Sequence, residues 1–233
     1  MNTGITSVAR LAGDQVRTVL AAADQAPGRP AWRFDCTATT IELHEKGDST
    51  DPGHAARVLA CGGALLNLRL AVQALGVYAD VRLAPDPDRP SVLAVVRPEH
   101  ERLATTWDRR LAHMIANRII PHAGGQAVAA LGELRKAADV EQAWLARLSD
   151  AQLASLGVPV LGTRLVLVIG SLQDDVRSLL HAGQAVQRVT LTAATLGFVT
   201  IPLGEPLATP AARTRLRALI GGALSPHAVL AVG

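Results

Sequence analysis

The chain has 233 residues, of which 49% are hydrophobic and 18% are charged, and its formal net charge is +3. This length and composition allow one large packed domain or two small interlocked ones, and they exclude a disordered protein. Only 3% of the residues are aromatic and no basic run occurs, so we expect no nucleic-acid partner.

No apolar run reaches the roughly 20 residues that a bilayer requires, and the first residues lack the pattern of a secretory signal. We therefore expect a cytoplasmic protein with no membrane association. Cys36 and Cys61 are the only cysteines, and neither has the spacing or the neighbouring ligand residues of a metal site. The seven histidines form no short-spaced pair either, so we expect two buried thiols, mostly surface histidines and no metal site.

The first half of the chain alternates predicted helices and strands. Apolar residues recur at helical spacing over 5–24, and the prolines of the following QAPGRPA end that helix. The segment 32–45 alternates like a half-buried hairpin. The next helix, over 54–76, is apolar around most of its circumference, so we expect it to be central to the fold. Strands at 78–84 and 91–98 follow it.

The second half continues with helices over 99–118 and within 126–156. A buried strand over 163–171 follows, because its residues are continuously apolar and β-branched. Asp174 and Asp175 are typical capping and first-turn acids of a second long helix. The remaining predicted elements are, in order, that helix over 174–197, a strand over 198–204, a helix near 209–221 and a strand over 228–233.

Two stretches 121 positions apart are nearly the same. CGGALLNLRLAVQALG (61–76) matches AGQAVQRVTLTAATLG (182–197), so that Gly76 falls on Gly197. A repeat of half the chain is too long for a solenoid unit and indicates a duplicated half-domain. We therefore predict an α+β fold of two interlocked half-repeats around central apolar helices, with a mixed or antiparallel sheet. The predicted halves are 1–98 and 163–233, joined by a helical segment 99–162.

The order of AP and WRF within 26–34, then 61–76, then GQAVQRVTLTAATLGFVTIPL (183–203), resembles the nitroreductase superfamily. The resemblance covers about 8–121 and 160–233. It is strongest to the Acg-type actinobacterial branch, in which one chain carries two nitroreductase-like halves that mimic the usual homodimer. It implies FMN bound between the halves, reduced by NAD(P)H, with hydride passed on from the flavin. Relatives also carry a longer segment between the halves.

Two family motifs for FMN are reduced here. The loop AP-S-x-H-N-x-Q-P-W corresponds to APGRPAW (26–32), which is about three residues shorter and lacks the Ser, His, Asn and Gln. Trp32 and Arg33 match the end of the motif. In the family's phosphate-binding run, Arg-Arg-Ser/Thr-x-Arg, only Arg118 remains, while Arg109 and Arg110 lie about a turn and a half upstream. Arginine suits a phosphate because it offers fixed, charge-assisted donors.

These departures lead to three functional hypotheses, and no catalytic residue is identified. The first is a degenerate nitroreductase-fold protein without conventional FMN binding, which acts as a binding or partner protein or as a flavin-independent enzyme. The second is an FMN-dependent NAD(P)H oxidoreductase with a rebuilt flavin site. The third is a hetero-oligomer in which a protein partner completes the site. A small molecule or flavin would lie at the interface of the halves.

The expected cofactor is therefore none, with FMN as the alternative. If flavin or another anion binds, the candidate residues are Trp32, Arg33, Arg109, Arg110 and Arg118. Each also has a structural interpretation: Trp32 as a core anchor, and the arginines as partners of acids. Gly170 and Ser171, between a strand and a helix, could present amides to an anion. An ordinary turn explains that pair as well.

Overall fold

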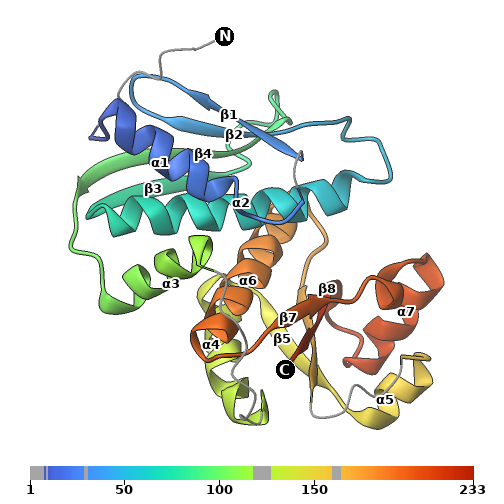
Figure 1. Ribbon diagram of the computed structural model, residues 1–233. Coiled ribbons are helices and arrows are strands. Elements are labelled where there is room, and N and C mark those ends of the chain that lie inside the picture. Colours follow the sequence, from blue (N-terminus) through green and yellow to red (C-terminus); the bar gives the residue numbers. More distant parts are fainter. Residues whose placement is uncertain (1–7, 9, 29–30, 118–126, 159–163) are drawn as a thin grey trace. The chain divides into compact units, whose positions relative to one another are not determined.

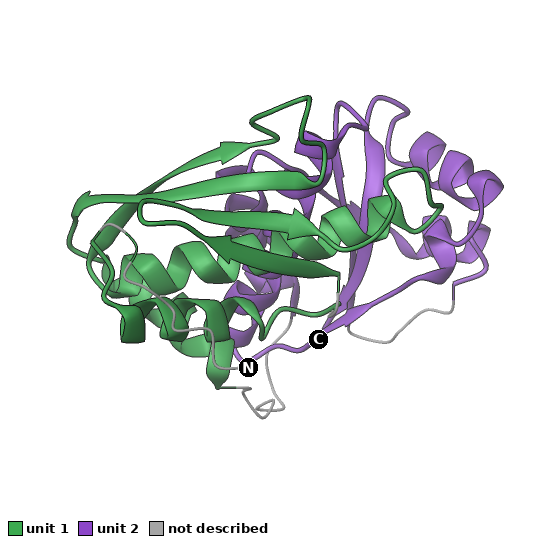
Figure 2. Ribbon diagram, turned by 90° about the horizontal axis from the view of Figure 1, so that it is seen from above, with its two compact units in different colours: residues 1–117 green, residues 118–233 purple. Residues whose placement is uncertain are grey.

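The computed structural model describes residues 8, 10–28, 31–117, 127–158 and 164–233. It divides into two compact units, 1–117 and 118–233, which Figure 2 colours separately. The boundary falls inside the segment 99–162 that the sequence assigns to a connection. The strand residues 99–101 and one helix of that segment belong to the first unit, and its remaining described elements belong to the second.

The first unit is an antiparallel sheet with helices on one face (Figure 1). Its strand order is β1-β2-β4-β3. Helices α1 and α2 pack next to each other against the sheet. Helix α3 packs on the side of α2 that faces away from the sheet. The elements are α1 (Gly13–Ala23), β1 (Trp32–Cys36), β2 (Ile41–Glu45), α2 (His54–Ala74), β3 (Val77–Leu83), β4 (Val92–Glu101) and α3 (Thr106–Ala116).

The second unit has the same plan with two additional helices. Its antiparallel sheet has the order β5-β6-β8-β7. Helices α4 and α6 correspond in order and packing to α1 and α2. The elements are η1 (Ala127–Ala130), α4 (Leu131–Val140), β5 (Trp144–Leu148), α5 (Asp150–Ser155), β6 (Leu165–Ser171), α6 (Val176–Thr195), β7 (Thr200–Pro202), η2 (Glu205–Leu207), α7 (Pro210–Leu219) and β8 (Ser225–Val232).

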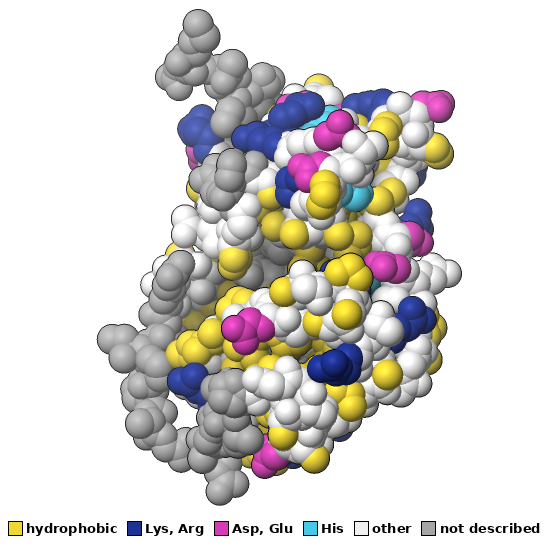
Figure 3. Space-filling model, turned by 90° about the vertical axis from the view of Figure 1, so that its right-hand side faces the viewer, with side chains coloured by type: hydrophobic (Ala, Val, Ile, Leu, Met, Phe, Trp, Pro, Cys, Tyr) yellow, Lys and Arg dark blue, Asp and Glu magenta, His cyan; other side chains and the backbone are white. Residues whose placement is uncertain are grey.

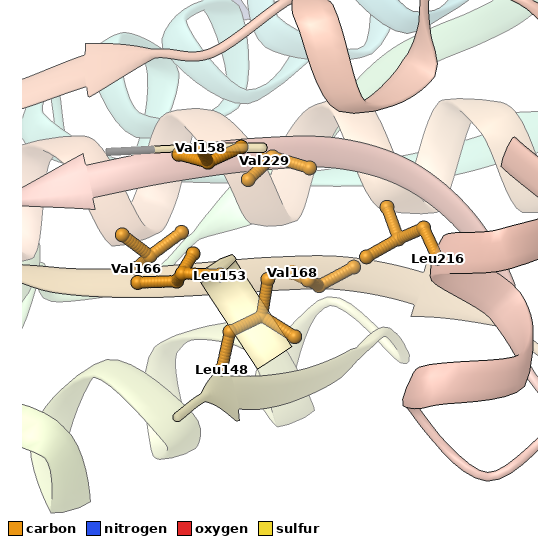
Figure 4. Close-up of a cluster of buried hydrophobic side chains, with 7 residues drawn as sticks. All are labelled: Leu148, Leu153, Val158, Val166, Val168, Leu216 and Val229. Carbon is orange, nitrogen blue, oxygen red and sulfur yellow. The ribbon is translucent and has the colours of Figure 1, made fainter. Parts of the chain in front are cut away.

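The additional helices α5 and α7 cover the second face of the second sheet. Their side chains meet those of β5, β6 and β8 in one apolar cluster (Figure 4). Its members are Leu148, Leu153, Val158, Val166, Val168, Leu216 and Val229. Both β6 and β8 are buried along their whole length, as strands covered on two faces must be.

The α+β prediction is confirmed, and both sheets are antiparallel throughout. The two long helices lie where the repeat predicts. Each is followed by a glycine in the left-handed region, Gly76 with φ +78° and Gly197 with φ +84°. Each glycine N–H bonds a carbonyl three residues back. Glycine ends both helices because this backbone conformation has no Cβ penalty for it.

Three local predictions need correction. The segment 97–101 continues β4 opposite β3, and a capping box of Thr105 and Asp108 begins α3 only afterwards. The Ala-rich segment 126–156 contains the strand β5, because it pairs with the buried β6. Of the two cysteines predicted to be buried, Cys36 is exposed. It is the last residue of the edge strand β1.

The helix α2 is long and apolar enough to span a membrane, with a mean hydropathy of 1.4, contrary to the prediction that no segment is. Two thirds of this stretch, 67%, is nevertheless buried inside the protein. A soluble core helix has the same composition, so the helix is only weak evidence for a membrane span.

Candidate functional site

The two hairpin residues that match the family loop face opposite sides of the first sheet. Trp32 is 4% exposed, and its indole N–H donates to Asp24 at the end of α1 at 3.2 Å. It therefore lies on the helix side and anchors the hairpin to α1. Arg33 is the next residue along the strand, so its side chain lies on the outer side of the sheet.

The outer side of the hairpin carries a network of charged groups around His44. The guanidinium of Arg33 pairs with Asp35 and lies 3.2 Å from Nδ1 of His44. The other ring nitrogen of His44 is 3.1 Å from Glu42. Arg89 bonds Glu42 with both terminal nitrogens, the shorter bond being 2.6 Å. These bonds lower the pKa of Asp35, mainly through Arg33, and that of Glu42, mainly through Arg89.

The candidate phosphate arginines lie elsewhere. Arg109 and Arg110 are exposed on α3, and Figure 1 places α3 and β1 on opposite sides of α2. Arg118 is outside the described residues. The described candidates therefore form no common cradle within the first unit. Trp32 and Arg33 already have partners of their own, so they do not fit a conventional FMN phosphate site.

On the helix side of the hairpin, a buried carboxylate joins β2 to the start of α2. Glu45 lies opposite Trp32 in the hairpin, and its side chain is 2% exposed. Its carboxylate accepts a bond of 2.8 Å from Nε of Arg57 and lies 2.9 Å from Nδ1 of His54. His54 and Arg57 are three residues apart in the first turn of α2, so they share one face.

Two glycines make room for the arginine of this cluster. A Cβ at Gly47, where φ is +138°, would lie 2.6 Å from Nε of Arg57, and one at Gly53 would lie 2.8 Å from its Nη1. The guanidinium also bonds the Asp48 carbonyl at 2.6 Å and Asp51 at 3.0 Å. Arg57 thus holds the loop 47–53 against the buried Glu45.

Beside this loop lies a hollow of about 450 Å³. It is open to solvent and has a mixed polar and apolar lining, from Glu45, Gly47, Asp48, Ser49, Pro90 and Ser91. Glu45 forms part of its wall, but its carboxylate is already neutralised by Arg57. The hollow is a place for a small polar group rather than an apolar pocket for a planar ring, which a flavin would need.

The buried thiol nearby is not reactive. Cys61 on α2 is fully buried, and its Sγ lies 3.6 Å from the Ala31 carbonyl, which it can reach as a weak donor. Burial raises the pKa of this thiol to about 12, and the charge of Glu45 adds to the effect. Because the thiolate is the nucleophile, a thiol with so high a pKa has a structural role.

The sequence did not single out Glu45, His54 or Arg57. One signal was present: in the alternating strand 41–45, a charged residue occupies an inward position. Basic residues then follow in the first turn of the next helix. The prediction of mostly surface histidines fails at His44 and His227, which are 4% and 6% exposed. Of the two histidines near the phosphate motif, His113 is exposed and His122 lies outside the described residues.

Similar proteins connect this geometry with a family. Two mycobacterial proteins, NAD(P)H nitroreductase Rv3131 and its counterpart MT3217 from a second strain of Mycobacterium tuberculosis, are each 29% identical to this chain. The alignment covers 94% of this chain and 85% of each relative. This likeness over nearly the whole chain supports membership of the nitroreductase superfamily. The names of both relatives give the nitroreductase activity as provisional. No family model matches the chain.

The alignment with these nitroreductase relatives runs over 292 residues, more than the 233 of this chain. It must therefore contain segments of the relatives that this chain lacks. This agrees with the shortened character that the resemblance implied. Among the described residues, no group of three or more His, Cys, Asp or Glu side chains is arranged to hold a metal ion.

Proposed function

We propose that this chain is a nitroreductase-type protein that has lost the usual grip on the FMN phosphate. It acts as a binding protein or as an enzyme that needs no flavin. A binding role suits the hollow at Glu45, whose open wall of mixed polar and apolar groups favours a small polar ligand over a flavin ring. The internal duplication, supported by the shared strand order of the two sheets, makes the chain the equivalent of a nitroreductase dimer.

The observation that carries this proposal is the state of Arg33. It matches the end of the family loop, but Asp35 and His44 already occupy its guanidinium. A phosphate at this guanidinium would lie beside the Asp35 carboxylate, whose negative charge would repel it. Each lost bond to a charged group removes about 1.5–3 kcal/mol of binding free energy, so the loss of several such donors leaves little affinity for the phosphate.

Flavin occupancy tests the proposal. The protein is purified in the presence of excess FMN, desalted, and its flavin absorbance is compared with its protein concentration. We expect occupancy far below one flavin per chain and no thermal shift on adding FMN. Near-stoichiometric yellow protein would contradict the proposal.

The second candidate is an FMN-dependent NAD(P)H oxidoreductase of nitroreductase type, which the names of the two relatives favour. In this case Arg109 and Arg110, exposed on α3, would supply the rebuilt phosphate site together with Arg118. The double variant Arg109→Gln/Arg110→Gln would then weaken FMN binding at least tenfold. Arg82→Gln is the matched control, because Arg82 is an exposed arginine on β3. Under the first proposal neither variant changes the already weak flavin binding.

A protein partner that completes the site is the third hypothesis, and it has its own test. Native mass measurement of the chain alone and with co-encoded proteins tests for the partner that the third hypothesis requires. A stable lone monomer under both conditions would count against that hypothesis. We place the protein in the cytoplasm without a membrane anchor, supported by the burial of its most apolar helix.

A further inference from the structure

A buried histidine joins two strands of the second unit to the loop that precedes α6. The ladder between β6 and β8 is irregular between Ile169 and Gly170, which brings Ser171 opposite Ser225. The backbones approach so closely there that a Cβ on Gly170 would lie 2.6 Å from the Ser225 carbonyl oxygen. Two residues further along β8, Nε2 of His227 lies 2.6 Å from the Ser171 hydroxyl.

The hydrogen bonds of Ser171 determine which imidazole nitrogen carries the proton. The Ser171 hydroxyl lies 2.5 Å from the Gln173 carbonyl, which can only accept, so the single hydroxyl proton is donated there. Nε2 of His227 must therefore be the donor to Ser171. In the neutral ring Nδ1 is then unprotonated, and it is buried without a hydrogen-bond partner among the described residues.

The nearest acid to that nitrogen is Asp174, whose Oδ1 is 3.7 Å away. Ser171 contacts His227, which faces Asp174, as in the triad of a hydrolase, but the chemistry differs. The hydroxyl proton points to a carbonyl and not to the histidine, and Ser171 is only 6% exposed. A nucleophilic serine needs both the base and access to substrate.

We propose that His227 and Asp174 form an acid-sensitive latch that fastens the connection between β6 and α6 onto β8. In the neutral state the Nδ1 lone pair repels the carboxylate, and Asp174 stays 57% exposed. A second proton can enter only at Nδ1. It creates a cationic donor that faces Asp174, and a contact of 3.7 Å then shortens to a hydrogen bond. The residues 172–175 move with it, directly before the first turn of α6.

Burial lowers the pKa of His227 below its ordinary value, and the groups around it act in both directions. Asp174 raises this pKa and Arg213 of α7 adds to the lowering. A hydrogen bond with the Gln173 backbone and, more weakly, the charge of Asp175 also raise it. Arg213 bonds the adjacent Pro226 carbonyl at 3.3 Å. Of the other elements against β8, β7 has no titratable side chain, Glu205 of η2 is exposed, and Arg177 of α6 acts on Asp175. The latch therefore closes at a lower pH than that at which an ordinary histidine gains its proton.

Two variants of the full chain with opposite expected effects test the latch. The titration of each histidine is followed by NMR of its imidazole carbons, and the protection of amides 172–175 by hydrogen exchange corrected for intrinsic rates. In the parent, protection should rise severalfold as His227 gains its proton. Asp174→Asn should move the His227 midpoint to lower pH and abolish the rise in protection. Arg213→Gln should move the midpoint to higher pH and leave the rise in protection in place.

His44 in the first unit is the internal control, because neither substitution touches its surroundings. Its imidazole signals at a fixed pH should be the same in all three proteins. An unchanged His227 midpoint in Asp174→Asn would overturn the latch. So would protection of 172–175 that stays constant through the titration of His227 in the parent. Arg213→Gln keeps the test decisive should the other variant fail to fold.

Discussion

The two units share one topology but treat the outer face of their sheets in opposite ways. In the first unit this face carries the charged groups Arg33, Asp35, Glu42, His44 and Arg89. In the second unit α5 and α7, which have no counterparts in the first, cover it with an apolar core. Figure 3 shows acidic and basic side chains interspersed on one face of the molecule. The same strand order thus supports a half-solvated sheet and a sheet buried on both sides.

The central helices α2 and α6 also differ at one position of the repeat, where one has a neutral side chain and the other a charged one. Asn67 of α2 falls on Arg188 of α6, 121 residues later. The Asn67 amide donates to the Ala22 carbonyl in the last turn of α1 at 3.1 Å. Arg188 instead forms a buried ion pair of 2.6 Å with Glu141, the residue that caps α4. Both contacts tie the central helix to the end of the first helix, one through an amide and one through charges.

Breaking the ion pair should have the largest effect. Arg188→Met removes the cation from a buried ion pair with Glu141 and should cost about 3–5 kcal/mol of unfolding free energy. Asn67→Ala is the matched change in the other unit and should cost less, about 1–2 kcal/mol, because the bond to the Ala22 carbonyl is between neutral groups. Urea unfolding read by hydrogen exchange mass spectrometry resolves the two units.

The double variant Arg188→Met/Glu141→Leu separates charge burial from packing. It should recover most of the lost stability, since a buried pair can be replaced by apolar residues of similar volume. Equal losses for Arg188→Met and Asn67→Ala would contradict the proposed difference between the two helices.

The apolar core under α7 gives the second prediction. Leu216 is fully buried, so Leu216→Ala should destabilise the second unit by about 2–5 kcal/mol through lost contacts and a cavity. Val95→Ala on the outer face of β4 is the counterpart in the first unit. It should cost about 1 kcal/mol or less, because that face is partly solvated. A large loss for Val95→Ala would mean that another surface covers the first sheet.

The charged outer face predicts a smaller, pH-dependent effect. Arg89, and then His44, hold the pKa of Glu42 below its ordinary value. A carboxyl with a lowered pKa in the folded state contributes stability above its unfolded pKa and loses it as the pH falls through the folded value. Glu42→Gln should therefore lower stability at pH 7 and flatten its decline below about pH 4.5. Urea unfolding of the parent and of Glu42→Gln across this pH range measures the decline.

The sequence predicts the fold better than the site. Periodicity and the repeat located both long helices and their terminal glycines, because these depend on local pattern and backbone conformation. The strand β5 was missed, since its pairing with β6 overrides its Ala-rich surroundings. Glu45 and His227 were missed because their partners, Arg57 and Ser171, are 12 and 56 residues away. Nothing in the local sequence brings such residues together.

The relative affinity for FMN and riboflavin tests the central claim most directly. The two flavins differ only in the phosphate, so their ratio isolates the phosphate grip from the ring contacts. A conventional site with two or more charged donors would favour FMN by about 100-fold or more. We predict a ratio within a few-fold of one, or no measurable binding of either, in fluorescence titrations of the full chain. A preference for FMN of 100-fold would contradict the account.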